Sequence, residues 1–182
     1  MRRMRRQRLP GSHGFPAYSG IFMMLAVAAA DAFPGFANAA EPVTLAVSDF
    51  DFRDTSGEAR DQSAEHAKRL KALGITLQEG LSAIGRLNIV PMTCETGGCT
   101  ARTAGLEALS IKARDVGATY LLIGEVRKLS TLVGGVKFAV LDLTSNKPTC
   151  DRFLSYRGDT DEAWRRAAAF AAQDIEKHCL PK

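Results

Sequence analysis

The spacing of apolar residues after position 42 predicts an alternation of short strands and amphipathic helices. Residues 43–47 and 87–90 are short runs of aliphatic and β-branched side chains, which are typical of strands. Between them, apolar residues recur every three or four positions, so they share one face of a helix over 62–84. This stripe consists of Leu70, Leu73, Leu77, Leu81 and Ile84.

The middle of the chain continues the alternation. Residues 106–116 form an amphipathic pattern closed by Gly117, which predicts a second helix. Residues 120–126 are almost continuously apolar, as in a strand buried on both faces, so we expect this strand at the centre of the sheet. Gly134 and Gly135 then interrupt the pattern as a bend or a bulge.

The last part of the chain predicts a strand meander and a closing helix. Strands over 136–143 and 150–156 are joined by the polar turn 144–148. Asp159, followed three residues later by Glu162, resembles a capping box at the start of the helix. The order β-α-β-α-β-β-β-α predicts a single α/β domain with a mixed sheet of about five strands and about three helices. The apolar stripe of the last helix is Trp164, Ala168, Ala171, Ile175 and Cys179.

The first 39 residues have the pattern of an export signal. A basic start is followed by the apolar run 21–30 and by a small-x-small cleavage site, Ala37-Asn38-Ala39. A membrane anchor is the alternative, but it needs roughly 20 consecutive apolar residues, and Asp31 and Pro34 break this run. We therefore expect 1–39 to be a cleaved signal peptide and 40–182 to be one periplasmic domain, with no membrane span after cleavage.

Cleavage changes the charge balance. The chain has 24 basic and 20 acidic side chains, but five arginines and Asp31 precede the cleavage site, so 19 of each sign remain. Nucleic-acid binding needs a concentrated positive face. Because the remaining charges alternate in sign along the chain, we expect no nucleic-acid partner.

The four cysteines, which all follow the cleavage site, predict two disulfides in an exported chain. A zinc site is disfavoured, because the Cys94-x4-Cys99 gap is wider than in zinc knuckles and has no nearby histidine. Three pairings are possible. The glycines within 94–99 favour a small closed loop, Cys94–Cys99, which leaves Cys150–Cys179 as the second pair.

An acidic segment follows the first strand and reads as a polar loop over 48–57. Carboxylates close together can bind a hard cation such as calcium, although Arg53 occupies a position where an EF-hand needs an acidic or amide group. The alternative is that these groups satisfy loop amides and cap the next helix. Two phenylalanines alternate with the acids and form a partner-binding surface if the segment is an exposed loop, or join the core if it continues the strand. The candidate residues are Asp49, Phe50, Asp51, Phe52, Asp54 and Glu58.

No pattern of catalytic residues is present in the sequence after residue 39. The available bases are His66, in a charged helical run that predicts a solvent-exposed face, and His178, near the C-terminus. No G-x-S-x-G, H-E-x-x-H or phosphate-loop motif occurs. The arginines around Gly158 could bind an anion at a helix start, but they serve equally to cap and solubilise that helix. We expect no enzyme, no cofactor and no metal.

Several phrases resemble the N-terminal domain of TolB and its relatives in curli-type secretion. They are the segments 45–50, 87–91 and 113–126, in the same order and with a hairpin after the last. Closer still, 49–67 and 157–167 are similar to a family of small secreted bacterial proteins, domain of unknown function 2380. This resemblance implies a TolB N-terminal-domain-like fold and a periplasmic domain without a lipidation cysteine. The TolB β-propeller is absent from the sequence, so its cell-division role is not implied.

The expected function is that of an exported, non-catalytic periplasmic accessory or interaction protein. Its partner is expected to be a periplasmic or envelope protein. The alternative is a periplasmic small-ligand or divalent-cation binding protein that uses the acidic segment 49–58.

Overall fold

The computed structural model describes residues 43–94 and 98–182. Within them, six strands form one mixed sheet in the order β3-β1-β4-β5-β6, and β2 also pairs with β4. The pairings of β1 with β3 and of β1 and β2 with β4 are parallel, whereas β4, β5 and β6 form an antiparallel meander. The strands are β1 (Val43–Val47), β2 (Asp51–Asp54), β3 (Leu87–Val90), β4 (Tyr120–Lys128), β5 (Val133–Asp142) and β6 (Lys147–Arg157).

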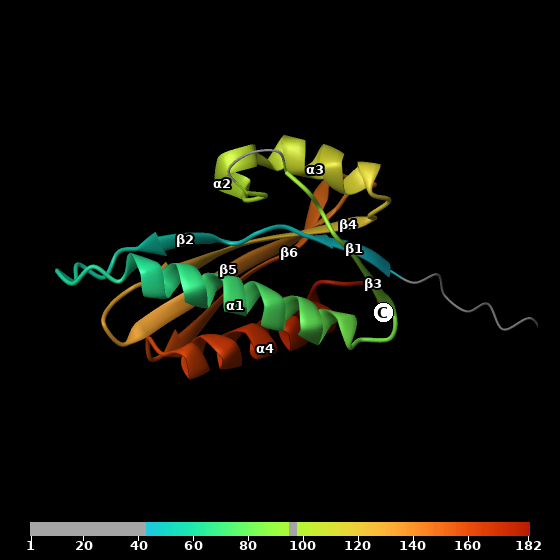
Figure 1. Cartoon of the computed structure of the whole chain (residues 1–182). Coiled ribbons are helices and arrows are strands. Elements are labelled where there is room, and N and C mark those ends of the chain that lie inside the picture. Colours follow the sequence, from blue (N-terminus) through green and yellow to red (C-terminus); the bar gives the residue numbers. More distant parts are fainter. Residues whose placement is uncertain (1–42, 95–97) are drawn as a thin grey trace, which may run out of the picture. The chain divides into compact units, whose positions relative to one another are not determined.

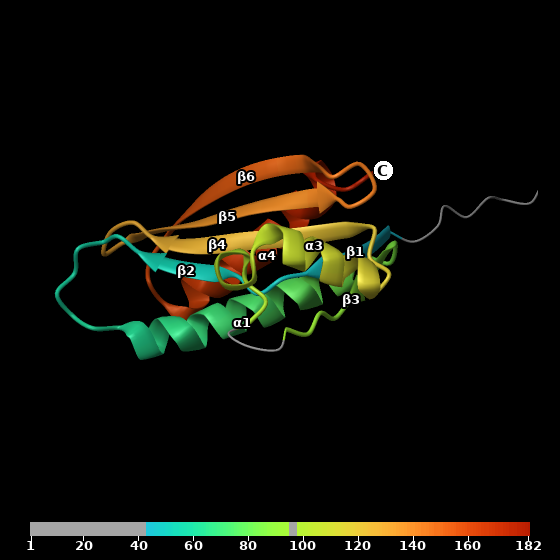
Figure 2. The same ribbon diagram turned by 90° about the horizontal axis from the view of Figure 1, so that it is seen from above.

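Helices cover the two faces of the sheet unequally (Figures 1 and 2). The long helices α1 (Ser63–Ser82) and α4 (Asp161–His178) lie side by side on one face, and the short helices α2 (Ala101–Ala104) and α3 (Leu106–Asp115) lie on the other. The expected α/β class with a mixed sheet is confirmed. The strand β2 and the helix α2 are additions to the predicted order.

The main core lies between the sheet and the two long helices. The leucine stripe of α1 is buried at Leu73, Leu77 and Leu81, as its spacing predicts. All members of the α4 stripe are buried as well, and they pack against the sheet residues Leu122 and Phe138. A smaller core beneath α3 joins Leu109 and Ala113 to one end of the sheet.

The segment predicted as a polar loop over 48–57 instead contains the strand β2. In the β1–β4 pairing Val47 lies opposite Leu122, whereas in the β2–β4 pairing Asp51 lies opposite Glu125. Four residues along one strand thus match three along the other, so the turn 48–50 adds a single residue, as a β-bulge does. Side chains alternate between the two faces of a strand. After the extra residue, the side chains therefore point to the opposite face from the one they would have in an unbroken strand.

Two local expectations are corrected in the second half of the domain. Gly134 and Gly135 do not interrupt the strand but lie within β5, where the rings of Tyr156 and Phe153 occupy the places that a Cβ atom would take. The cap of α4 is Thr160, whose hydroxyl accepts the amide of Ala163 at 3.2 Å. Asp159 therefore has a different role, described below.

Two disulfides connect elements of the domain. Cys94 is bonded to Cys99, and Cys150 in β6 is bonded to Cys179 at the end of α4. These are the pairs that the sequence favours. The predicted signal peptide, 1–39, and the residues 95–97 of the cysteine loop lie outside the described residues. No helix in the two described ranges is long and apolar enough to cross a membrane.

Candidate functional site

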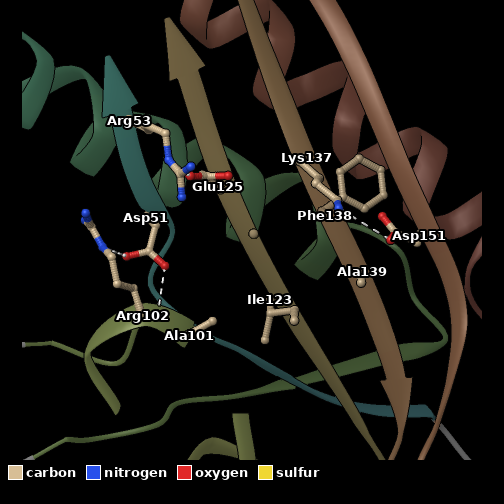
Figure 3. Close-up of a pocket in the computed structure, with 11 residues that line it drawn as sticks. Asp51, Arg53, Ala101, Arg102, Ile123, Glu125, Lys137, Phe138, Ala139 and Asp151 are labelled. Carbon is tan, nitrogen blue, oxygen red and sulfur yellow. Dashed lines mark hydrogen bonds and ion pairs between the residues drawn. The ribbon is translucent and has the colours of Figure 1, made fainter. Parts of the chain in front are cut away.

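One half of the sheet has no helix over it on the side of α2 and α3. Side chains alternate between the faces of each strand, and α3 covers only the part of this face near Leu121 and Leu141. The remaining part, here called the open face, is formed by β2, β4, β5 and β6 (Figure 3). Its side chains are Asp51, Arg53, Glu125, Arg127, Lys137, Ala139, Asp151 and Phe153.

A hollow of about 350 Å³ lies on the open face. Ile123, Gly124 and Ala139 form its apolar floor, and charged side chains surround it, as Figure 3 shows. Arg102 of α2 closes one side. An apolar floor within a charged rim is the composition of a protein-binding surface.

The charged groups of the open face are held by one another. Glu125 forms an ion pair with Arg53 at 2.8 Å and accepts the Arg127 guanidinium at 2.6 Å. The Asp51 carboxylate accepts both the backbone N–H and the Nε–H of Arg102, each at 3.1 Å. These contacts hold the rim side chains in fixed orientations.

The four acids of the candidate segment do not share one place. Asp49 accepts the Cys99 amide at 2.8 Å, Asp51 binds Arg102, Asp54 accepts the Ser56 hydroxyl and amide, and Glu58 pairs with Lys128. Each carboxylate thus has a protein partner. Across the described parts of the chain, no group of three or more acidic, histidine or cysteine side chains is placed to hold a metal ion.

Of the two alternatives for Phe50 and Phe52, the structure has the core one for both rings. Phe50 is 6% exposed and its ring lies over Gly124, where a Cβ atom would clash with it. Phe52 is half-buried and packs against the rings of His66 and Trp164 at centroid distances of 4.8 and 5.8 Å. The added residue in 48–50 turns both rings inward and leaves Asp51 and Arg53 on the open face.

A buried polar cluster, which the sequence analysis did not identify, lies beside these rings. His66, expected on a solvent-exposed face, is only 2% exposed and hydrogen-bonds the Asp159 carboxylate through Nε2 at 2.8 Å. Lys128 is 3% exposed and pairs with Glu58, with Asp159 3.4 Å from its Nζ. The cluster consists of Glu58, His66, Arg69, Lys128, Asp159 and Trp164.

Charge pairing decides the ionisation of this cluster. Burial alone raises the pKa of Asp159, but hydrogen bonds from His66 and Trp164 and the charge of Arg69 outweigh it and lower that pKa. Burial likewise opposes the charge of Lys128, yet its contacts with Glu58 and Asp159 raise its pKa. Both groups stay ionised. Because His66 and Lys128 are sealed from solvent, the cluster stabilises the fold and offers no accessible base.

A signal for these two buried residues was present in the sequence. His66 precedes Leu70, Leu73 and Leu77 at helical spacing, so it belongs to the buried stripe of α1. Lys128 follows Val126 by two residues and so shares its inward face of β4. Charged side chains are usually exposed, so the sequence alone favoured a solvent-exposed position for both residues. They are buried because Glu58 and Asp159, from other parts of the chain, pair with them.

The fold is a single mixed α/β domain. The chain belongs to the family described as "Protein of unknown function (DUF2380)", whose sequence profile matches residues 43–175. The resemblance to this family is confirmed. No curated protein matches the chain.

Solved structures with a similar fold come from several bacteria. The LpoB C-terminal domain of Salmonella enterica is 15% identical, with a TM-score of 0.42 over 65% of this chain and 85% of that domain. The PelC dodecamer of Paraburkholderia phytofirmans is 16% identical, with a TM-score of 0.44 over 78% of this chain and 92% of that one. TolB of Acinetobacter baumannii is 12% identical, with a TM-score of 0.48 over 76% of this chain and 28% of TolB.

Proposed function

We propose that this protein is an exported periplasmic accessory protein without catalytic activity, which binds another envelope protein through the open face. The basic start, the apolar run and Ala37-Asn38-Ala39 support export. Two disulfides fit an oxidising compartment.

The observation that carries the proposal is the uncovered half of the sheet with its hollow. A sheet face within a domain is normally packed against another layer, and here four strands present side chains of both charges around an apolar floor instead. The sealed His66 and Lys128 argue against catalysis, because a substrate cannot reach them. The four separated carboxylates likewise disfavour the cation-binding alternative.

Site-specific photo-crosslinking in the periplasm tests this function. A photoreactive amino acid at Lys137, on the open face, is expected to give a discrete adduct with one envelope protein. The matched control is the same amino acid at Lys71, an exposed residue of α1 on the opposite side of the sheet, where no adduct is expected. Equal labelling from both positions, or none from Lys137, would contradict the proposal.

Charge reversal on the open face gives a second test of where the partner binds. Reversing the charge of Glu125 removes the acceptor of two guanidinium groups, so Glu125→Lys should reduce the adduct while Lys71→Glu leaves it unchanged. An adduct that survives both changes would place the contact elsewhere.

A further inference from the structure

The free edge of β6 borders the open face, and the proposed function does not use its outward backbone groups. This strand has 11 residues and ends the sheet, with β5 on one side and no strand of the described chain on the other. Its outward N–H and C=O groups are therefore available to pair with another strand. The features that usually blunt such an edge occur only at its start: Pro148 and the register irregularity opposite Val140 and Leu141.

The usable part of this edge is defined at both ends. The Thr149 hydroxyl donates to the carbonyl of Cys179 at 2.6 Å, so the C-terminal segment occupies the beginning of the strand. At the other end Gly158, with φ of 93°, turns the chain towards α4. Residues 151–157 remain as a regular edge in which odd-numbered side chains are exposed and even-numbered ones are half-buried.

An apolar groove runs beside the same edge. It has a volume of about 340 Å³ and lies between β6 and α4. Phe170, on its α4 side, is 56% exposed. An unpaired backbone edge next to an apolar groove can take up a strand through main-chain hydrogen bonds and bury side chains at the same time. Its apolar walls are Leu154, Tyr156, Ala163, Ala167 and Phe170.

We propose that β6 pairs with β6 of a second copy of this chain, antiparallel, with Leu154 on the two-fold axis. A two-fold axis perpendicular to the sheet places the open faces of both copies on the same side. Two residues that lie opposite each other across the axis must then point to the same face, so their numbers are both odd or both even. Centring the pair at Asp151 or Arg152 would oppose identical charges, which is unfavourable. Centring it at Leu154 places Asp151 opposite Arg157 on both sides of the axis.

The other positions of this register also fit. On the open-face side, Phe153 of each copy lies opposite Ser155 of the other copy. Neither phenylalanine ring is therefore directly opposite a charged side chain. On the α4 side the two apolar grooves meet across the axis, and Leu154 packs against its copy. Arg152, which is held by Asp174 at 2.9 and 3.1 Å, comes opposite Tyr156 of the second copy, so no uncompensated charge is brought to the seam. This register would therefore combine main-chain hydrogen bonds, the Asp151–Arg157 charge pairs and burial of Phe170.

This dimer would make one continuous sheet from two domains. Because the axis is perpendicular to the sheet, both open faces look to the same side, and the dimer presents two copies of the candidate binding surface. Two linked sites raise the avidity for a partner that is itself multivalent.

Sedimentation of the mature protein over a concentration series tests the pairing. The mass is expected to rise from monomer to dimer, and Asp151→Arg and Arg157→Asp should each raise the dissociation constant by about tenfold or more, because each places like charges together twice. The double variant restores opposite charges and should recover the dimer. Lys71→Asp, on α1, is the control and should leave the mass unchanged.

The three variants also separate pairing from misfolding. Both positions are exposed, so at concentrations at which all the proteins are monomeric the far-ultraviolet circular dichroism spectra and thermal midpoints of the single variants should match those of the wild type. Hydrogen exchange should show additional protection within 151–157 in the dimer, at the amides that point away from β5. A protein that remains monomeric at all concentrations, or a dimer unaffected by the single reversals, would overturn the proposal, and neither result would bear on the partner-binding role of the open face.

Discussion

Asp159 is the residue on which side chains from three elements converge. Its carboxylate accepts hydrogen bonds from Trp164 at 3.0 Å and from Arg69 at 3.0 Å, and it contacts His66 and Lys128. These partners belong to α4, α1 and β4. The carboxylate therefore connects the helix pair to the centre of the sheet through groups whose charges are compensated in place.

Replacing Asp159 by Asn should destabilise the domain by about 3 kcal/mol, because removing one member of a buried charge pair leaves the others uncompensated. Urea unfolding at neutral pH measures this loss. Asp161→Asn is the matched control: Asp161 also binds Arg69, but its side chain is 72% exposed, so its replacement should leave the free energy of unfolding nearly unchanged.

The pH dependence of stability in the wild type and in Asp159→Asn gives a second test of the role of Asp159. The pKa of Asp159 lies below its ordinary value of 3.8 in the folded state, so the unfolded chain binds the proton first as the pH falls. The stability contributed by this carboxylate is therefore present above about pH 4 and is lost as the pH falls towards the folded pKa. The gap between wild type and Asp159→Asn should narrow over that interval, and a constant gap would contradict the assignment.

At the scale of the elements, the spacing of apolar residues correctly predicted the long helices and strands. The helix expected over 62–84 is α1 at Ser63–Ser82, and the strand expected over 87–90 is β3. The two missed elements, β2 and α2, have four residues each, which is too short for a periodic pattern. They form because of partners distant in sequence: β2 pairs with β4, and the start of α2 binds Asp51.

The two disulfides should contribute unequally to stability. Cys150–Cys179 closes a loop with a sequence separation of 29, whereas Cys94–Cys99 closes one of 5. Because loop closure restricts the unfolded chain more for longer loops, removing the first pair by two Cys→Ala changes should cost about 3–4 kcal/mol and removing the second about 2 kcal/mol. Urea unfolding of the two double variants measures the difference, and equal losses would count against it.

At the scale of the whole molecule, the order of elements could be predicted but not the exposure of the sheet. The continuous apolar run 120–126 indicated a central strand, and β4 does pair with β1, β2 and β5. The open face arises because α2 and α3 together cover only one end of the sheet. That outcome depends on packing distances, and no local pattern around Lys137 or Asp151 encodes it.

The predicted export of the chain remains to be measured. We expect the periplasmic protein to begin at Ala40 or Glu41, since signal peptidases cut after small-x-small sites such as Ala37-Asn38-Ala39. Intact mass spectrometry of protein recovered from the periplasm gives the N-terminus. Recovery of a form that still carries Met1 would contradict cleavage.

The bulge formed by the single added residue in 48–50 decides which side chains of β2 face the core. Upstream of it, Leu45 and Val47 face the long helices; downstream, Phe50 and Phe52 do so. If the same residues paired with β4 without the bulge, both rings would lie on the open face and Asp51 and Arg53 would enter the core. Removing the extra residue itself would join β1 directly to β2 and leave both rings inward, so the family is expected to tolerate loss of the bulge together with the residue that forms it, but not loss of the bulge alone.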